Sequence, residues 1–255
     1  MSLFEKGITP QNDMTPQKVN GEHSKLSEVF LPDERLPVSN TQVYPFQSIC
    51  RIDTLYSNNE SYFGTGAIIG PQTILTAAHN IYRKDFGLGT NFTIVPGLNG
   101  SSKPYGSFHT SVCEYPKKWI ETFDQKYDFG AIFLSQPLPN TLHPIEFASL
   151  DDDILNSKPT ITICGYPKDK PEIGHPLAGR MQYYHSSKIS EVTPFTFKYY
   201  TDTKPGQSGS PLLYKNGNNY FICAIHNTGG NPEPNSATRI TDEIFKIISK
   251  WRSNP

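Results

Sequence analysis

Three side chains of the sequence could together attack a carbonyl group: His79, Asp128 and Ser208. Ser208 lies between glycines in the run Gly206-Gln207-Ser208-Gly209-Ser210-Pro211, where a tight backbone turn would expose its hydroxyl. The backbone amides of Gly206 and Ser208 would then point at one spot and could bind an oxyanion. In this arrangement His79 accepts the serine proton, and Asp128 orients and stabilises the imidazolium. The residue types therefore predict acyl transfer through a serine nucleophile.

The local sequence around these residues supports this interpretation. His79 follows two alanines and the strand-like segment 73–76, which would deliver an imidazole into a cleft. Asp128 comes directly before the apolar segment 129–134. Each residue also has a structural alternative: a glycine-serine turn, a hydrogen-bonded histidine and an aspartate that caps a turn. Their joint occurrence in this order favours the catalytic interpretation over three separate structural roles.

Short β-rich segments separated by clusters of Gly, Pro, Asn and Ser make up most of the chain. We expect two series of strands, the first at 47–56, 62–69, 73–76, 91–95, 108–114 and 129–134, and the second at 160–165, 180–186, 194–200, 210–214 and 220–226. Two similar series predict an all-β fold with two antiparallel six-stranded β-barrels and a cleft between them. The segment 136–140 is the expected crossing between the barrels.

This layout places the candidate site between two domains. We assign residues 29–136 to an N-terminal β-barrel and residues 137–255 to a C-terminal β-barrel with a terminal helix. His79 and Asp128 then belong to the first barrel and Ser208 to the second. Clefts commonly form at such domain interfaces. The packing of the two domains is therefore expected to be part of the chemistry.

The two ends of the chain depart from the strand pattern. Residues 1–28 are polar, contain prolines and lack periodicity, so we interpret them as a pro-segment or flexible N-terminal tail. Toward the other end, Thr241 can cap a helix in which apolar residues recur at helical spacing from Ile244 to Trp251. We expect this C-terminal helix to pack its apolar stripe on the second barrel.

Composition and charge narrow the range of partners. The 255 residues carry a net charge of −1, which gives no electrostatic reason to expect nucleic acid or an anionic membrane as partner. No apolar run approaches the ~20 residues that span a bilayer. The four cysteines form no CxxC pair, so we expect no metal site and no cofactor. Buried free thiols are favoured, although the even number leaves two disulfides open.

The sequence resembles the glutamyl endopeptidases, a Gram-positive bacterial branch of the chymotrypsin-like serine proteases. The chain order His, Asp, Ser is that of the chymotrypsin arrangement. Matching segments include Thr65-Gly66 through His79, Val95-Pro96-Gly97, Gly165-Tyr166-Pro167, Gly206 to Pro211, and Ala224-Ile225-His226. The resemblance implies a two-barrel fold, secretion, and cleavage of protein or peptide substrates after Glu and less readily after Asp. We expect a monomer.

The resemblance also implies which residues bind the substrate. In this family a histidine on a pocket-wall strand and a threonine five positions before the nucleophile contact the substrate carboxylate. His226 and Thr203 hold these positions here. Both side chains can donate a hydrogen bond to a carboxylate without burying a fixed, unpaired cation. The segment from Asn227 to Gly229 is expected to pair with the substrate backbone as an added strand.

A further implication concerns the N-terminus, because in this family the free α-amino group of the mature chain helps to bind the substrate acid. Val29-Phe30-Leu31-Pro32 resembles such a mature start, and the preceding residue is Glu28. We therefore predict a zymogen in which residues 1–28 are removed and Val29 becomes the new terminus. Residues 1–25 contain no signal-peptide core, so either a secretion signal has been removed or the protein stays inside the cell. The resemblance favours the first.

Two departures from related proteases are visible in the sequence. Some relatives bridge two cysteines around the histidine loop, whereas this chain has Gly64 and Asn80 at those positions. We expect packing to hold the loop instead. Gln207 stands where the digestive proteases carry an aspartate that pairs with their new N-terminus. That activating ion pair is therefore excluded, and any activation must work through the specificity pocket.

Two other functions stay open at this stage. In one, the catalytic residues serve a protease with another or exosite-driven specificity, as in the related exfoliative toxins, and His226 is structural. In the other, the chain is a non-catalytic two-barrel binding protein. Cleavage-site profiling tests the first, and reaction of Ser208 with a fluorophosphonate tests the second.

Overall fold

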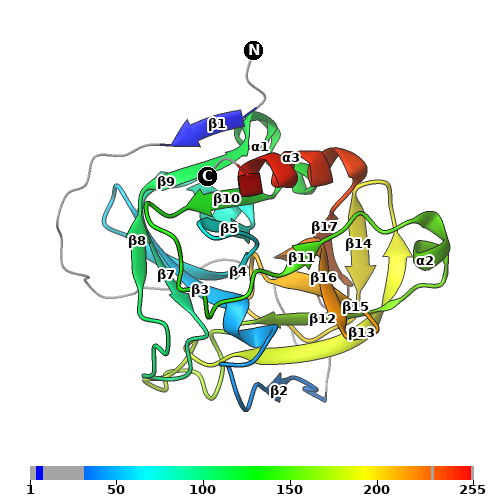
Figure 1. Ribbon diagram of the computed structural model, residues 1–255, viewed down its shortest axis with the longest axis horizontal. Helices are drawn as coiled ribbons and strands as arrows, with labels where there is room; N and C mark the ends of the chain where they lie inside the picture. The colour runs from blue at the N-terminus through cyan, green and yellow to red at the C-terminus, as the bar shows by residue number, and fades with distance from the viewer. Residues whose placement is uncertain (1–3, 8–31, 231–232, 254–255) are drawn as a thin grey trace.

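The computed structural model describes residues 4–7, 32–230 and 233–253 (Figure 1). The predicted new terminus, Val29, lies outside the described residues, as does most of the predicted pro-segment. Within that segment, β1 (Phe4–Gly7) pairs antiparallel with β9 (Val112–Pro116) and forms the outer strand of the first sheet. Residues 4–7 are thus a strand, which the polar sequence of this region did not indicate.

The first sheet is a curled antiparallel sheet. Its strands follow the order β1, β9, β10, β5, β4, β3, β7 and β6, with β8 paired to β7. Beyond β1 and β9 the bounds are β3 (Ile49–Tyr56), β4 (Ser61–Ile68), β5 (Thr73–Thr76), β6 (Tyr82–Arg83), β7 (Gly87–Pro96), β8 (Phe108–Thr110) and β10 (Gly130–Phe133). In the described ranges no ladder joins β8 to β9, so this half is open where a closed barrel would pair them. The single strand expected at 108–114 is divided at Ser111.

The second sheet closes into a six-stranded barrel. The path β16, β15, β12, β13, β14 and β17 returns to its start because β16 also pairs with β17. The bounds are β12 (Thr160–Gly165), β13 (Tyr183–Val192), β14 (Thr196–Tyr199), β15 (Pro211–Asn216), β16 (Asn219–Thr228) and β17 (Asn235–Arg239). Two short strands also pair with strands of the barrel, β2 (Leu36–Pro37) with β13 and β11 (Glu146–Phe147) with β16. The predicted all-β fold class is confirmed, with one correction: within the described residues the second sheet is a closed six-stranded barrel, whereas the first is a curled half-barrel.

Short helices link the strands and carry parts of the candidate site. They are the 3-10 turns η1 (Phe46–Ser48), η2 (Ala78–Asn80) and η3 (Gln125–Tyr127), and the helices α1 (Lys117–Thr122) and α2 (Asp152–Asn156). His79 lies in η2, and Asp128 follows directly after η3. Both catalytic candidates of the first half therefore sit on tight turns next to strands.

The C-terminal helix α3 (Asp242–Ser253) forms as predicted but packs more widely than expected. The Thr241 hydroxyl accepts a hydrogen bond from the Ile244 amide at 3.3 Å, which caps the helix. The Trp251 ring packs 5.7 Å from the ring of Phe129, next to β10, and the Thr73 hydroxyl of β5 donates to the Trp251 carbonyl. Besides sharing an apolar core with the second barrel, α3 therefore also contacts the first sheet, which the sequence did not indicate.

One apolar core joins the two halves. It contains Ala131 and Phe133 of β10, Ile222 and Ile225 of β16, and Trp251 of α3. Burial of apolar surface across this junction stabilises one relative placement of the two sheets. That placement also brings the turn that carries His79 toward the loop that carries Ser208.

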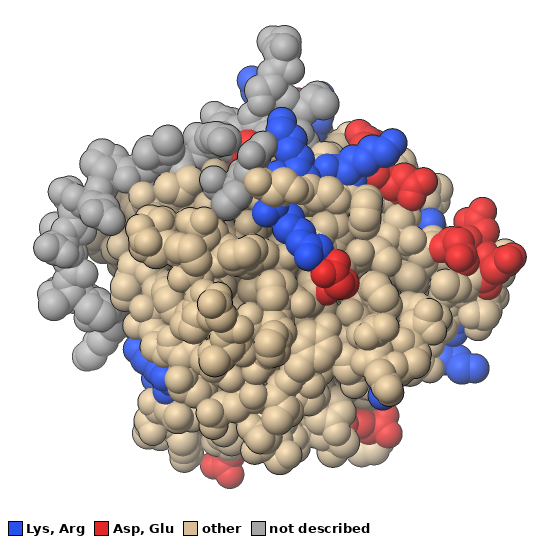
Figure 2. Space-filling view, viewed as in Figure 1, with Lys and Arg blue, Asp and Glu red and all other residues tan. Residues whose placement is uncertain are grey.

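The cysteines agree with the sequence expectation, and charged side chains gather on one part of the surface. Figure 2 shows basic and acidic side chains gathered near α3, with a largely uncharged central area on this face. The structure has all four cysteines free and buried: Cys50, Cys113, Cys164 and Cys223. Free thiols were favoured over disulfides. Within the described residues, no helix has the length and apolar character needed to cross a bilayer.

Candidate active site

Asp128 holds both the ring and the backbone of His79. Its Oδ2 atom lies 2.7 Å from His79 Nδ1, and its Oδ1 accepts a hydrogen bond from the His79 amide at 2.9 Å. Asp128 is buried, whereas the His79 side chain keeps 21% of its surface exposed. Because Nδ1 faces the carboxylate, Nε2 on the other side of the ring is left to exchange protons. The structure thus brings these two predicted residues together.

The loop between β14 and β15 carries Ser208 and is tied to both halves of the molecule. The Ser208 carbonyl accepts hydrogen bonds from the Thr65 amide and from Asn80 Nδ2, both at 2.8 Å. The next residue, Gly209, donates its amide to the His226 carbonyl at 2.7 Å. Within the described residues, no hydrogen bond joins the Ser208 hydroxyl to the His79 ring. Such bonds are often long before a substrate binds and tighten in the complex.

Asn80 is a site residue whose role the sequence did not reveal. Its side chain lies over Gly64, where an added Cβ would come within 2.4 Å of Asn80 Nδ2. Besides Ser208, Nδ2 donates to Thr76 Oγ1 at 2.9 Å. The two positions at which some relatives carry bridged cysteines are therefore in contact, and an amide replaces the disulfide. The sequence did contain one signal of this contact, because both cysteine positions are replaced together, by Gly64 and Asn80.

Gly206 has the backbone conformation that a candidate oxyanion turn needs. Its φ is +98°, a region that L-residues rarely adopt. A Cβ there would lie 2.3 Å from the Tyr166 carbonyl and 2.4 Å from the Phe63 ring. The Gly206 carbonyl accepts a hydrogen bond from Thr65 Oγ1 at 2.8 Å, which fixes the turn. In the described part of the chain, the amides of Gly206 and Ser208 donate no hydrogen bond, so both are available to a ligand.

The side chain and the backbone of Gln207 both stabilise the same turn through hydrogen bonds. Its Oε1 accepts a hydrogen bond from the Lys204 amide at 3.0 Å, and its own amide donates to the Lys204 carbonyl at 3.1 Å. The side chain is fully buried. A neutral amide therefore occupies the position at which an ion pair was excluded from the sequence.

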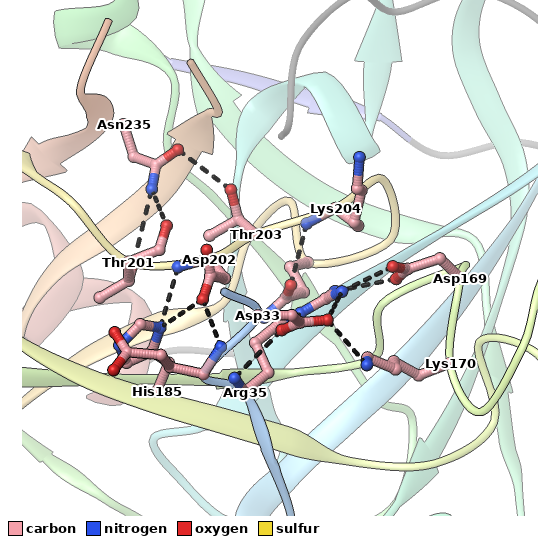
Figure 3. A network of polar contacts seen from close by, with 12 residues as sticks. Asp33, Arg35, Asp169, Lys170, His185, Thr201, Asp202, Thr203, Lys204 and Asn235 are labelled. Atoms are coloured by element: carbon pink, nitrogen blue, oxygen red, sulfur yellow. Dashed lines mark hydrogen bonds and ion pairs between the residues drawn. The ribbon is translucent and has the colours of Figure 1, made fainter. Parts of the chain in front are cut away.

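The residues expected to bind the substrate carboxylate lie on neighbouring elements of the second barrel. Thr203 is fully buried, and its hydroxyl donates to Asn235 Oδ1 at 3.0 Å (Figure 3). The same Oδ1 accepts the Gly230 amide, so the orientation of the Asn235 amide is fixed and the Thr203 proton is committed to it. The Thr203 hydroxyl would have to rotate away from Asn235 to reach a ligand.

His226 lies on β16 next to the turn that carries Ser208, and it is neutral. Burial, and next the electrostatic effect of His79, lower the pKa of His226 to about 3, against a smaller opposing effect of the Ser236 backbone. Its Nδ1 lies 2.5 Å from the Tyr199 hydroxyl. The imidazole therefore carries a single ring proton at ordinary pH.

The segment from Asn227 to Gly229 ends β16 and is connected to the turn that precedes Asp128. Asn227 Nδ2 donates to Thr238 Oγ1 at 2.8 Å and to the Gln125 carbonyl at 3.3 Å. Gln125 Nε2 in turn donates to Thr228 Oγ1 at 2.8 Å. The Asn227 side chain thus points into the protein, and the backbone of this segment is the part that could meet a substrate.

A polar network next to Thr203 fastens the segment 33–35 (Figure 3). Asp202 Oδ2 accepts a hydrogen bond from the Glu34 amide at 2.7 Å, and the Asp202 amide donates to His185 Nδ1 at 2.9 Å. Glu34, His185 and Asp202 also form a group whose ligand-type atoms lie within 4.8 Å of one another. Because Asp202 Oδ2 and His185 Nδ1 already take part in those hydrogen bonds, we assign no metal there.

Arg35 adds a second clamp on the same segment. Its guanidinium is buried and lies 2.9 Å from Asp33 Oδ2 and 2.6 Å from Asp169 Oδ2. The hydrogen bond from Arg35 holds the pKa of Asp33 below its usual range. The chain that follows the predicted new terminus is therefore anchored beside the candidate pocket, an arrangement that the sequence did not indicate.

The fold and these contacts define a serine protease of the chymotrypsin type. A family model described as trypsin matches residues 38–248, and the chain belongs to this family. It is 32% identical to the glutamyl endopeptidase of Bacillus licheniformis over 267 residues, which covers 99% of this chain and 80% of that protein.

Two further comparisons also match most of the chain. The chain is 32% identical over 231 residues to a Bacillus subtilis protein named extracellular metalloprotease, with 88% of this chain and 70% of that protein covered. A solved structure of Glu endopeptidase in complex with MPD superposes with a TM-score of 0.76 at 27% identity, covering 89% of this chain and 100% of the other. The protein is a serine endopeptidase similar to the glutamyl endopeptidases.

Proposed function

We propose that the protein is a secreted endopeptidase that hydrolyses peptide bonds on the carboxyl side of glutamate, and less readily of aspartate. The observation that carries this proposal is the placement of His226, a neutral, buried imidazole. The backbone carbonyl of His226 accepts a hydrogen bond from the Gly209 amide at 2.7 Å, and the backbone amide of His226 donates to the Ser210 carbonyl at 2.9 Å. A hydrogen-bonding group is thereby held next to the nucleophile.

The proposed catalytic residues are His79, Asp128 and Ser208. His79 Nε2 takes the Ser208 proton as the hydroxyl attacks the substrate carbonyl, and Asp128 stabilises the imidazolium that forms. The amides of Gly206 and Ser208 bind the oxyanion, and each such donor contributes about 3 kcal/mol to stabilisation of the transition state. His79 then protonates the leaving amine, and water repeats the sequence on the acyl-enzyme.

Recognition of glutamate is assigned to His226 and Thr203, with Asn227 to Gly229 pairing with the substrate backbone. A neutral imidazole can donate to a carboxylate without a buried fixed charge, and a hydrogen bond to a charged group is worth about 1.5–3 kcal/mol. Thr203 contributes only if its hydroxyl exchanges Asn235 for the substrate. The pocket therefore relies first on His226.

The proposed activation step is removal of residues 1–28, which makes Val29 the N-terminus. Asp33 is anchored through Arg35, and Val29 precedes it by four residues. Four extended residues span at most about 14 Å. The new α-amino group is therefore confined to the neighbourhood of the anchored segment, where it could add a positive charge to the acid-binding pocket.

Cleavage-site profiling of the processed protein on a peptide library tests this proposal, with Ser208→Ala as the blank. We expect glutamate to dominate the position before the cut, aspartate to follow, and N-terminal sequencing to start at Val29. Profiles without acidic enrichment would point to another or exosite-driven specificity. No cleavage together with no fluorophosphonate reaction would point to a binding protein.

A further inference from the structure

Tyr199 lies on β14, and its hydroxyl meets the ring of His226. We propose that Tyr199 is a positioning residue that fixes the tautomer of His226, so that Nε2 carries the ring hydrogen and can donate it to the substrate carboxylate. This inference rests on the proposed preference for glutamate. It adds a specificity residue that neither the motifs nor the sequence resemblance indicated.

The contact between the two side chains is buried and rigid. Tyr199 has no exposed surface, and its hydroxyl lies 2.5 Å from His226 Nδ1. The backbones of both residues are fixed by ladders to β17, in which Tyr199 pairs with Asn235 and His226 with Ala237. Neither side chain can turn away without breaking the packing of the closed barrel.

The direction of this hydrogen bond follows because the buried phenol hydroxyl needs an acceptor for its hydrogen. Burial raises the pKa of Tyr199 well above its ordinary value, so the hydroxyl keeps its hydrogen. In the part of the chain that the structure describes, His226 Nδ1 is the partner that this hydroxyl has. A buried hydroxyl without an acceptor is costly, so Tyr199 donates and Nδ1 accepts.

The tautomer decides how the ring meets an acid. A neutral imidazole has one N–H and one lone pair. With Nδ1 accepting from Tyr199, the hydrogen is on Nε2, which can then donate to a carboxylate. The opposite tautomer would present a lone pair at Nε2 and repel the same carboxylate. One buried hydroxyl therefore converts a neutral ring into a donor without adding a charge.

The chain offers a direct physical test in Tyr199→Phe, with Tyr214→Phe as the matched control. Tyr214 is half-buried on β15 of the same barrel and has no contact with His226 among the described hydrogen bonds. Matched peptides with Glu, Gln or Ala before the cut give kcat/KM for each enzyme. We expect Tyr199→Phe to lower kcat/KM at least about tenfold for the Glu peptide and much less for the Ala peptide. The control should keep the wild-type ratios.

A second readout does not depend on the substrate. Nitrogen-15 NMR of the ring of His226, in the Ser208→Ala protein and assigned with His226→Gln, reports which nitrogen bears hydrogen. We expect Nε2–H in the parent and loss of that fixed state in Tyr199→Phe, with fluorophosphonate labelling of Ser208 retained in the active background. If Tyr199→Phe does not fold, the tautomer of the parent still decides.

The outcomes separate this inference from the proposed function. An Nδ1–H tautomer in the parent, or an unchanged Glu-to-Ala ratio in folded Tyr199→Phe, overturns the role of Tyr199. A wild-type enzyme without preference for Glu overturns the proposed function instead, whatever tautomer is measured.

Discussion

The side-chain amide of Asn80 donates a hydrogen bond to the backbone carbonyl of Ser208 at 2.8 Å. Asn80 directly follows His79 in the first half of the chain, whereas Ser208 belongs to the second. The same nitrogen also donates a hydrogen bond to Thr76 Oγ1, and the Asn80 side chain lies over Gly64. One buried amide thus ties the backbone of the proposed base to that of the proposed nucleophile.

Replacement of Asn80 by alanine should therefore weaken both stability and activity. The Ser208 carbonyl loses one of its two donors, and a void forms over Gly64. We expect a loss of about 1–3 kcal/mol in the free energy of unfolding and a fall of at least about tenfold in kcat/KM. Chemical denaturation and peptide kinetics measure these effects, with Asn218→Ala on an exposed turn as the control. Equal behaviour of the two variants would contradict the role of Asn80.

Gly206→Ala should abolish most activity, because its Cβ would meet the Tyr166 carbonyl at 2.3 Å. The turn would have to open, which would displace the two amides that are proposed to bind the oxyanion. We expect kcat to fall by about a hundredfold or more. Gly217→Ala is the matched control, since Gly217 also has a positive φ of 60° but no atom within 4 Å of an added Cβ. It should cost about 1 kcal/mol of stability and leave kcat unchanged. Comparable losses of kcat in both would argue against a special role for Gly206.

Acid should destabilise the protein through His226. Its pKa is about 3 in the folded state against 6.5 as the ordinary value, so the unfolded chain binds the extra proton between these pH values. Stability should therefore fall as pH decreases from about 6.5 toward 3, with a limiting slope of about 1.4 kcal/mol per pH unit from this one group. Unfolding of Ser208→Ala and of Ser208→Ala/His226→Gln from pH 4 to 7 isolates the effect. Parallel stability curves for the two proteins would show that His226 is not held neutral.

Arg35→Gln should loosen the anchored segment beside the pocket. It leaves the carboxylates of Asp33 and Asp169 without their guanidinium. Because both are partly exposed, with side-chain exposures of 25% and 17%, we expect about 1–3 kcal/mol rather than the larger cost of a fully buried pair. Arg252→Gln breaks the exposed pair with Glu146 and should cost no more than about 1 kcal/mol. If activation depends on this anchor, only Arg35→Gln lowers kcat/KM for a Glu peptide.

Much of the architecture could be predicted from the sequence because its signals are local. The turn around Ser208, the apolar segment after Asp128 and the spacing in α3 were each visible in short stretches. β17 was missed because its buried residues, from Asn235 to Thr238, are small or polar and give no apolar alternation. The open edge of the first sheet was not foreseen either, since pairing between strands is not a local property.

The parts of the site that escaped prediction are contacts between distant residues. Tyr199 is one aromatic residue among many in the sequence, and only the barrel places its hydroxyl on His226. Asp202 likewise accepts a hydrogen bond from the amide of Glu34, 168 positions earlier in the chain. Such pairs leave no mark in spacing, so the proposed catalytic residues could be predicted from the sequence, whereas the residues that position them could not.

The most direct test of the central claim is the labelling of Ser208 by a fluorophosphonate in the processed wild type and in His79→Ala, followed by mass spectrometry. If an imidazole of the first half activates a hydroxyl of the second, Ser208 is modified in the wild type and remains almost unmodified in His79→Ala over the same time. Equal labelling of the two proteins, or labelling of the wild type at another residue, would contradict the account.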